Sequence, residues 1–305
     1  MPELPELQAH AERLDAAYAG APLDRFSALT FHALKTFSPR PEVTTGQALV
    51  FVGRRGKYLL ADFGTATFVV HLMQGGRLRP EAPLRSRKAE QPEGGTRIGE
   101  AGAAKAAGSS RAQKPRGGLA RWEFGDDRAW LLTEAGHERR AGVWVVGGDP
   151  ESSEPLSKLG PDANLVDATT LVELFAAHPM RLHGFLRDQR IIAGIGRRLA
   201  NEVCHRAKLS PFATTRKLGT DEAERLVEAI AVTVNESLAF ERGRDDMSSS
   251  ADRPGAVHHR EGEACPVCAD TVRSVSYRSY TVGYCPTCQT SGKFLADNTT
   301  SKFLK

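Results

Sequence analysis

Residues 265–288 read CPVCADTVRSVSYRSYTVGYCPTC, and this stretch carries the clearest structural signal in the chain. It holds two Cys-Pro-x-Cys knuckles with sixteen residues between them, which brings four thiolates within reach of one tetrahedral metal ion. Residues 272–276 and 280–284 are predicted to be the two strands of a zinc ribbon. Because four protein ligands leave no open position on the metal, we expect one structural Zn²⁺ per chain. The predicted ligands are Cys265, Cys268, Cys285 and Cys288.

The region before the ribbon is predicted to be helical as far as a polar loop at 241–259. Its most informative part is residues 189–202, QRIIAGIGRRLANE, in which a Gly-x-Gly turn leads into a helix. Free backbone N–H groups at such a turn suit a phosphate group, and Arg197 and Arg198 add positive charge. An ordinary packing turn between two helices would give the same pattern. The apolar periodicity predicts helices at 168–177, 180–186, 196–207 and 221–240.

The N-terminal half is predicted to be antiparallel sheet behind one opening helix. Leu4, Leu7, Ala11, Leu14 and Tyr18 recur at helical spacing, which indicates one amphipathic helix. Short apolar and β-branched runs follow, separated by glycine-containing turns. The predicted strands lie at 48–52, 58–63, 67–72, 119–124, 129–133 and 143–146.

Residues 80–118 interrupt the predicted strands. They are rich in small and charged residues and almost lack large apolar ones, which is typical of a long solvated, flexible insert. Between Arg79 and Arg121 there are ten lysines and arginines against four acidic residues, so a basic arm that touches DNA is the alternative. The net charge of the chain is only +4, and it therefore does not by itself indicate a nucleic-acid surface.

The composition is that of an ordinary globular protein. The chain has 305 residues, of which 40% are hydrophobic and 26% charged, enough for two or three domains. No apolar run is long enough to predict a transmembrane helix, and the first residues resemble neither a secretory signal nor a transit peptide. We therefore expect a cytoplasmic protein. Cys204, which stands apart from the ribbon, is expected to be a buried helix residue.

The chain opens with Met1-Pro2-Glu3-Leu4-Pro5-Glu6. If Met1 is removed, Pro2 exposes a secondary amine whose pKa lies near neutrality, so part of it is an uncharged nucleophile. Glu3 and Glu6 lie beside it and could transfer protons. The same residues also suit a plain helix start, which favours proline and acidic side chains in its first turn.

Two further polar residues follow turns in the predicted sheet. Lys57, in Gly56-Lys57-Tyr58, could contact a phosphate or donate a proton, or it could be an ordinary surface lysine. His71 ends a predicted strand and precedes Gly75-Gly76. It could equally be a buried, hydrogen-bonded histidine.

In their order along the chain, these motifs resemble the formamidopyrimidine-DNA glycosylase and endonuclease VIII family. The resemblance covers almost the whole chain and implies an α+β fold. The implied domains are an N-terminal β-sandwich with a flanking helix at 1–150, a helix-two-turn-helix domain at 151–262 and a four-cysteine zinc ribbon at 263–305. The matching motifs are Pro2–Glu6, Gly56–Tyr58, His71-Leu72 with Gly75-Gly76, Leu159–Asp162, Ala193–Gly196 with Ala200–Glu202, and the cysteine module.

The resemblance implies a bifunctional DNA glycosylase and AP lyase of base excision repair. Pro2 would attack C1′ of the damaged nucleotide, Glu3 would be the acid/base residue that opens the sugar, and Glu6 would support it. Lys57 would contact phosphate and donate a proton during β-elimination. The partner would be damaged DNA with the lesion rotated out of the stack, bound by a monomer. The DNA-binding residues implied are His71, Gln74, Arg139, Arg197, Asn201 and Arg278.

Several residues depart from the family pattern. Arg197 stands where the family has a phosphate-binding asparagine, and Gln74 aligns near a void-filling methionine. Ala141 aligns with the usual wedge phenylalanine, which leaves Arg139 as the candidate intercalating residue. Tyr280 occupies the place of the zinc-finger arginine, with Arg278 nearest to it. These departures point to single-stranded, bubble or cross-linked substrates, which need less gap filling.

The sequence is also compatible with two other functions. A non-catalytic protein that binds damaged or abasic DNA could have kept the same scaffold, because the altered wedge and finger residues concern DNA recognition. A zinc-ribbon nucleic-acid adaptor is the second alternative, since small four-cysteine modules occur in many kinds of protein. Retention of Met1 would favour either of them over the enzyme.

Overall fold

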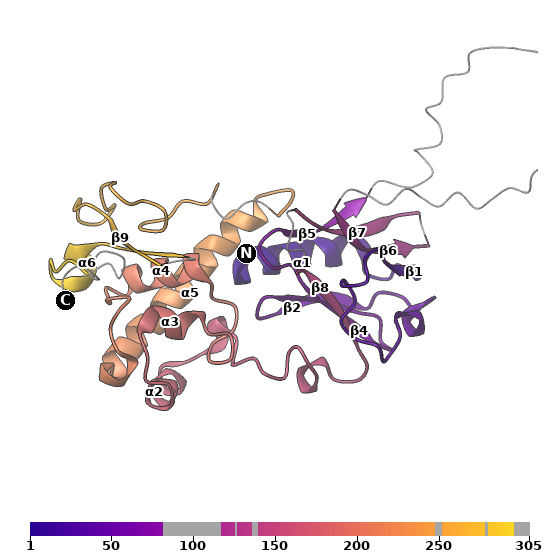
Figure 1. Cartoon of the computed structure of the whole chain (residues 1–305), viewed down its shortest axis with the longest axis horizontal. Helices are drawn as coiled ribbons and strands as arrows, with labels where there is room; N and C mark the ends of the chain where they lie inside the picture. The colour runs from indigo at the N-terminus through magenta and orange to yellow at the C-terminus, as the bar shows by residue number, and fades with distance from the viewer. Residues whose placement is uncertain (82–116, 126, 136–139, 248–251, 278–279, 296–305) are drawn as a thin grey trace, which may run out of the picture.

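The computed structural model describes residues 1–81, 117–125, 127–135, 140–247, 252–277 and 280–295, and it forms two lobes (Figure 1). The N-terminal lobe is a sandwich of two antiparallel sheets, with strand orders β1-β6-β7-β5 and β2-β3-β4-β8. One apolar core joins both sheets: Phe68 of β4 and Trp122 of β6 meet edge to face at 5.6 Å. The strands are β1 (Leu23–Ala28), β2 (Phe51–Arg55), β3 (Tyr58–Asp62), β4 (Thr67–His71), β5 (Gly76–Glu81), β6 (Gly118–Phe124), β7 (Ala129–Glu134) and β8 (Gly142–Val146).

The opening helix α1 (Leu4–Tyr18) joins the two lobes. Leu7 and Leu14 pack into the sandwich core, whereas Leu4 belongs to the core of the helical lobe. Glu3 is the N-cap residue and forms a capping box with Glu6. The apolar spacing of α1 therefore buries one face in the sheets and places the start of the chain between the lobes.

The second lobe consists of α2 (Ala168–Ala177), α3 (Leu182–Arg187), α4 (Arg197–Arg206) and α5 (Thr220–Arg242). Their apolar faces, among them the packed rings of Phe175 and Phe185, form a second core. The predicted helices are therefore confirmed, with small shifts at their ends. Among the described residues, no helix has the length and apolar character needed to cross a membrane.

The C-terminal module is the predicted ribbon. β9 (Arg273–Ser276) pairs antiparallel with β10 (Thr281–Tyr284), and the short helix α6 (Pro286–Thr290) follows. The Gln289 side chain donates to the Leu209 carbonyl oxygen at 2.9 Å, which anchors the module to the helical lobe.

Some boundaries differ from the sequence prediction. The sequence did not predict β1 and β5. The strand predicted at 48–52 corresponds to β2, which lies at 51–55. β5 extends to Glu81 and β6 begins at Gly118, so the ends of the predicted 80–118 insert belong to the sheet. The rest of that insert lies outside the described residues. β1, with the sequence LDRFSA, was missed because it is mostly exposed or half-buried and has no β-branched residue. Its apolar and polar residues do not alternate clearly enough to predict a strand.

Candidate functional site

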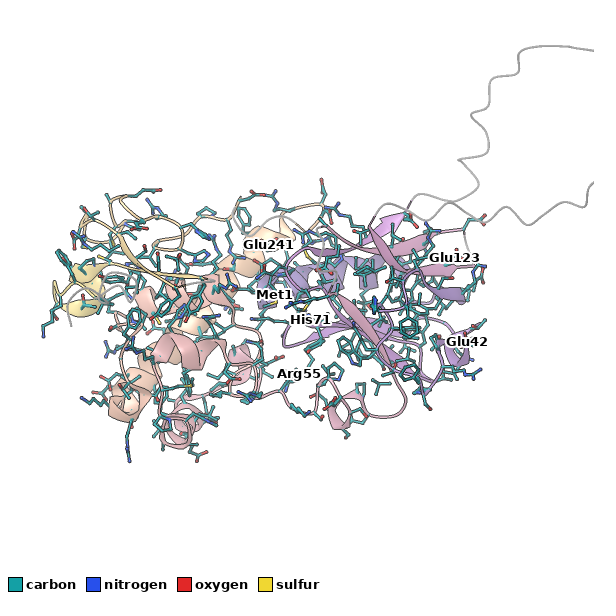
Figure 2. All side chains as sticks on the ribbon, viewed as in Figure 1. Met1, Glu42, Arg55, His71, Glu123 and Glu241 are labelled. Atoms are coloured by element: carbon teal, nitrogen blue, oxygen red, sulfur yellow. The ribbon has the colours of Figure 1, made fainter. Side chains whose placement is uncertain are left out.

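The start of the chain lies at the junction of the two lobes (Figure 2). Pro2 is buried, and Met1 beside it is 47% exposed. The Leu4 N–H donates to the Gly194 carbonyl oxygen at 3.0 Å, which ties the first residues to the turn before α4. Burial lowers the pKa of the chain's α-amino group, although Glu3 and Glu6 oppose the shift. The uncharged form of the amine is therefore favoured.

The Glu3 carboxylate sits on the N-terminus of α4. The N–H groups of Arg198 and Leu199 donate to its two oxygens at 3.0 and 2.9 Å. A Cβ atom on Gly196 would lie 2.1 Å from Glu3 Oε1, so only glycine leaves room for this contact. The prediction that these N–H groups bind a phosphate is therefore wrong, because a carboxylate of the same chain occupies them. Burial raises the pKa of Glu3, against the opposing charge of Lys57.

Glu6 links Glu3 to Arg253, which lies in the segment after α5. Its Oε2 accepts the Glu3 N–H at 3.0 Å, and its Oε1 accepts Arg253 Nη1 at 2.8 Å. Both charged side chains are almost fully buried. Arg253 was not a predicted site residue, because it lies in a polar stretch whose sequence gives no sign of a buried partner.

Lys57 lies in the two-residue turn between β2 and β3 and is 4% exposed. Gly56 takes the first position of this turn with φ +54, which suits a tight hairpin. Burial lowers the pKa of Lys57 to about 8, helped by Arg187 and Arg197 and opposed by Glu3. The lysine can therefore exchange a proton near neutral pH.

Asp162 holds this turn in place from the other lobe. Its Oδ1 accepts the Gly56 N–H at 2.9 Å and Arg55 Nη1 at 3.0 Å, and its Oδ2 accepts Arg54 Nη1 at 3.0 Å. The Gly160 carbonyl oxygen accepts Arg55 Nη2 at 2.8 Å. The Leu159–Asp162 motif thus positions Lys57, a function that its sequence did not reveal.

A cleft of about 520 Å³ opens beside these residues. Met1, Glu3, Gln74, Arg197, His258 and Tyr280 are among the residues that line it. Gln74 is exposed there and Arg197 is half-buried, which agrees with the predicted DNA-binding role of both without testing it.

Cations gather around the ring of Tyr280 at the edge of this cleft. The guanidinium of Arg187 lies 4.2 Å from the ring centre and that of Arg197 lies 5.9 Å from it. Tyr277 stacks on Tyr280 at 4.7 Å. Within the described ranges, neither arginine has a carboxylate partner. Both arginines help to lower the pKa of Lys57, whose charge Glu3 and Glu6 partly offset. Positive charge that is not paired with a carboxylate at the two described guanidiniums favours binding of a phosphate.

The other predicted DNA-binding residues lie elsewhere or are not described. His71 is half-buried, its ring lies 4.6 Å from that of Tyr58, and burial lowers its pKa to about 4. Asn201 is buried, and its amide lies 2.8 Å from Nδ1 of His258, a residue that lines the cleft. Arg139 and Arg278 lie outside the described residues.

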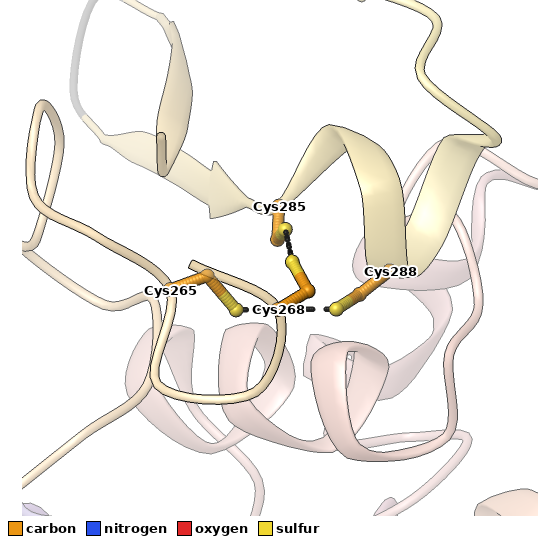
Figure 3. A group of neighbouring side chains, drawn as sticks. All are labelled: Cys265, Cys268, Cys285 and Cys288. Atoms are coloured by element: carbon orange, nitrogen blue, oxygen red, sulfur yellow. Dashed lines mark hydrogen bonds between the residues drawn. The ribbon is translucent and has the colours of Figure 1, made fainter. Parts of the chain in front are cut away.

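The four predicted zinc ligands converge at the base of the ribbon (Figure 3). Their sulfur atoms all lie within 4.8 Å of one another, close to the roughly 3.8 Å expected around a tetrahedral ion with Zn–S bonds of about 2.3 Å. His205 Nε2 lies 3.3 Å from Cys265 Sγ and links the cluster to α4. The residues present therefore fit a structural Zn²⁺. Cys204 is fully buried in α4, as predicted.

Comparisons with known proteins agree with this architecture. The formamidopyrimidine-DNA glycosylase N-terminal domain model matches residues 1–108, and the formamidopyrimidine-DNA glycosylase H2TH domain model matches residues 159–249. A formamidopyrimidine-DNA glycosylase of Rhodopseudomonas palustris is 31% identical over 95% of this chain and 100% of its own length.

Solved structures show the same fold. A formamidopyrimidine-DNA glycosylase of Lactococcus lactis bound to DNA with an AP site gives a TM-score of 0.74 at 19% identity, over 94% of this chain and 99% of its own. The MutM protein of Thermus thermophilus gives 0.72 at 24% identity, over 94% and 98%. From the coverage of the family models and of the full-length relative, the chain belongs to the formamidopyrimidine-DNA glycosylase family.

Proposed function

We propose that the protein is a DNA glycosylase and AP lyase of base excision repair. One observation carries the proposal: the start of the chain lies beside Glu3 and within electrostatic reach of Lys57, at a cleft edged by arginines without carboxylate partners among the described residues. The relatives named above are formamidopyrimidine-DNA glycosylases, and one related structure holds DNA with an AP site. Membership of this family supports a glycosylase, and the side chains supply the chemistry.

Pro2 is the proposed nucleophile. Removal of Met1 would leave the ring nitrogen of Pro2 as the α-amine. Pro2 is buried, and burial favours the uncharged form of an amine. The nitrogen lone pair attacks C1′, and the electrons of the glycosidic bond leave with the base, which takes up the proton that the nitrogen loses. Opening of the sugar ring at O4′ then gives an iminium between the nitrogen and C1′.

Glu3 is the proposed acid that protonates O4′ as the ring opens. Burial holds its pKa above the ordinary value, which favours a carboxyl that carries a proton when the sugar is bound. The two N–H groups of α4 then stabilise the carboxylate once the proton has left. Glu6 supports this step through its bond to the Glu3 N–H.

Lys57 is the proposed proton donor for β-elimination. The iminium acidifies the C2′ proton, and loss of that proton expels the 3′ phosphate, which needs a positive or proton-donating group beside it. With a pKa of about 8, the Lys57 ammonium can supply both. Arg197 would contact the phosphate backbone next to it, and Arg187, which the sequence did not single out, would do the same.

The preferred DNA is proposed to be single-stranded or to contain a bubble or cross-link. Gln74 at the cleft is a weak void filler, Ala141 is buried and cannot act as a wedge, and Tyr280 replaces the expected finger arginine. Excision from matched single- and double-stranded lesion oligonucleotides tests this proposal. Strict preference for duplex would contradict it.

We further propose that one Zn²⁺ on the four cysteines holds the ribbon in place, and that the protein acts on DNA as a cytoplasmic monomer. From the family resemblance, Arg139 and Arg278 remain proposed DNA-binding residues. For His71 and Asn201 their buried contacts point to support of the site rather than direct contact with DNA.

The proposed activity is tested with an oligonucleotide that holds one abasic site and with a panel of oxidised bases. The wild type is expected to nick the abasic strand by β-elimination and to excise at least one lesion, whereas Pro2→Gly loses most of both activities. If the wild type binds abasic DNA tightly but leaves it intact, the non-catalytic damaged-DNA binder is the correct function.

A further inference from the structure

Arg253 is a buried charged residue that contacts the proposed catalytic groups without being one of them. It lies between α5 and β9 and is 6% exposed. Its Nη1 donates to Glu6 Oε1 at 2.8 Å and to Glu241 Oε1 at 3.4 Å. Glu6 and Glu241 are 1% and 0% exposed, so one guanidinium serves two buried carboxylates.

The backbone of Arg253 reaches the other side of the site. Its carbonyl oxygen accepts a hydrogen bond from Arg198 Nη2. The Arg198 N–H in turn donates to Glu3 Oε1. Arg253 is therefore linked to Glu6 through its side chain and to Glu3 through Arg198.

These links end on the peptide that carries the proposed nucleophile. Glu6 Oε2 accepts the Glu3 N–H, which belongs to the peptide between Pro2 and Glu3. The ring nitrogen of Pro2 is attached to the Cα atom at one end of that peptide. Rotation of the peptide plane would therefore move the nitrogen, and misplacement by about 1 Å can cost on the order of 100-fold in rate.

The electrostatic surroundings explain why Glu6 needs this partner. Besides Arg253, the charged groups that act on the Glu6 region are the α-amino group, Glu3, Lys57 and Arg198. Within the part of the chain that the structure describes, Arg253 is the one of these that donates a side-chain hydrogen bond to Glu6. Removal of one partner from a buried pair leaves an uncompensated charge, which is strongly unfavourable.

We propose that Arg253 is a positioning residue for the N-terminal amine and acts through Glu6. The inference rests on the proposed function, because it assigns a nucleophile to residue 2. A residue that follows α5 in the sequence would then fix the position of a nucleophile at the start of the chain. Base excision and strand cleavage would then both depend on the segment between α5 and the ribbon.

Arg253→Met and Arg253→Lys, with Arg244→Met as matched control, test this role. Arg244 lies in the same segment, pairs with Asp252 at 3.3 Å and is much more exposed. The measurement is the single-turnover rate of borohydride trapping at saturating abasic-site DNA, beside the Kd for the same DNA. Arg253→Met should trap at least about tenfold more slowly with Kd within about twofold of wild type, and Arg253→Lys should recover much of the rate because it keeps the charge. Arg244→Met should match the wild type.

A second readout does not depend on activity. Hydrogen exchange of the Glu3 N–H, followed by NMR, should accelerate at least about tenfold in Arg253→Met, while amides in the middle of α5 keep their rates. If Arg253→Met proves too unstable, the test is repeated with the double variant Arg253→Met/Glu241→Gln. This variant also removes the charge of Glu241, so that only Glu6 loses a charged partner. Wild-type trapping and wild-type exchange at Glu3 in a folded variant would overturn the inference. A wild type that never traps would defeat the proposed function, yet the exchange experiment would still decide the role of Arg253.

Discussion

At the scale of single residues, the site contains buried ionisable groups whose charged forms are unfavourable for the folded state. Lys57 is buried with its pKa lowered to about 8, so the charged form is held in the folded protein at a cost. Glu3 is buried with its pKa raised. An amine with a lowered pKa close to a carboxyl with a raised pKa is typical of acid–base sites.

The lowered pKa of Lys57 predicts how β-elimination depends on pH. If its ammonium is the proton donor, the rate of strand cleavage at a preformed abasic site should fall about tenfold per pH unit above about 8. The same group should make the free energy of unfolding rise between about pH 8 and the unfolded value of 10.5, because the unfolded chain then binds more protons. A cleavage rate that stays flat up to about pH 10 would exclude Lys57 as the donor.

Glu3→Gln keeps the size of the side chain but removes the acid. Base excision should fall by roughly 10²- to 10⁴-fold, while trapping on a preformed abasic site, whose sugar opens without the enzyme, should fall much less. Parallel assays on a lesion and on an abasic oligonucleotide measure the difference. Equal losses in both assays would show that Glu3 acts mainly through structure.

Arg187→Ala and Arg197→Ala test the cation cluster on Tyr280. Each variant should weaken binding to all lesions alike and reduce the slope of log K against log salt by about 0.7–0.9 for each phosphate that the variant no longer neutralises. Titrations at several salt concentrations provide the slopes. Weaker binding to one lesion alone would mean that the arginine contacts the base.

At the scale of elements, two helix starts provide a matched comparison. Gly196 precedes α4 and Gly219 precedes α5, with φ values of −116 and −110 that any residue can adopt. A Cβ atom at 196 would collide with Glu3 Oε1 at 2.1 Å, whereas at 219 the nearest side-chain atom is 3.6 Å away. Gly196→Ala should therefore lose excision and roughly 1–3 kcal/mol of stability, and Gly219→Ala should keep excision. Thermal unfolding and excision rates of both variants are the measurements, and equal excision would contradict the assigned role of the Glu3 contact.

The sequence predicted those elements whose signals are local. The cysteine knuckles, the apolar face of α1 and the helices of the second lobe depend on spacing within a few residues, and the structure agrees with them. The bond of Glu3 to α4 joins residues almost two hundred positions apart, so the Gly-x-Gly turn suggested a phosphate instead of a carboxylate. Arg253 and Asp162 also bind residues distant in the sequence. A motif marks Asp162, but no local pattern shows which residues either of them contacts.

At the scale of the whole molecule, the site exists only where the lobes meet. The β-sandwich provides Lys57, the start of the chain at α1 provides Pro2 and Glu3, the helical lobe provides the N-terminus of α4 and Asp162, and the ribbon provides Tyr280. If the four cysteines hold the proposed Zn²⁺, its removal should therefore also change the cleft. A strong chelator should unfold the ribbon and weaken DNA binding at least about tenfold, while the N-terminal lobe keeps its β-sheet signal. Binding and circular dichroism with and without added Zn²⁺ measure this, and unchanged affinity in the metal-free protein would show that the ribbon does not shape the cleft.

The central claim is that a proline amine at the start of the chain bonds to the sugar of a damaged nucleotide. Borohydride reduction of the protein mixed with abasic-site DNA, followed by tandem mass spectrometry of the linked peptide, tests it most directly. We predict a stable adduct on the nitrogen of Pro2 in a chain that has lost Met1. An adduct on Lys57, or an intact Met1 with no adduct, would contradict the claim.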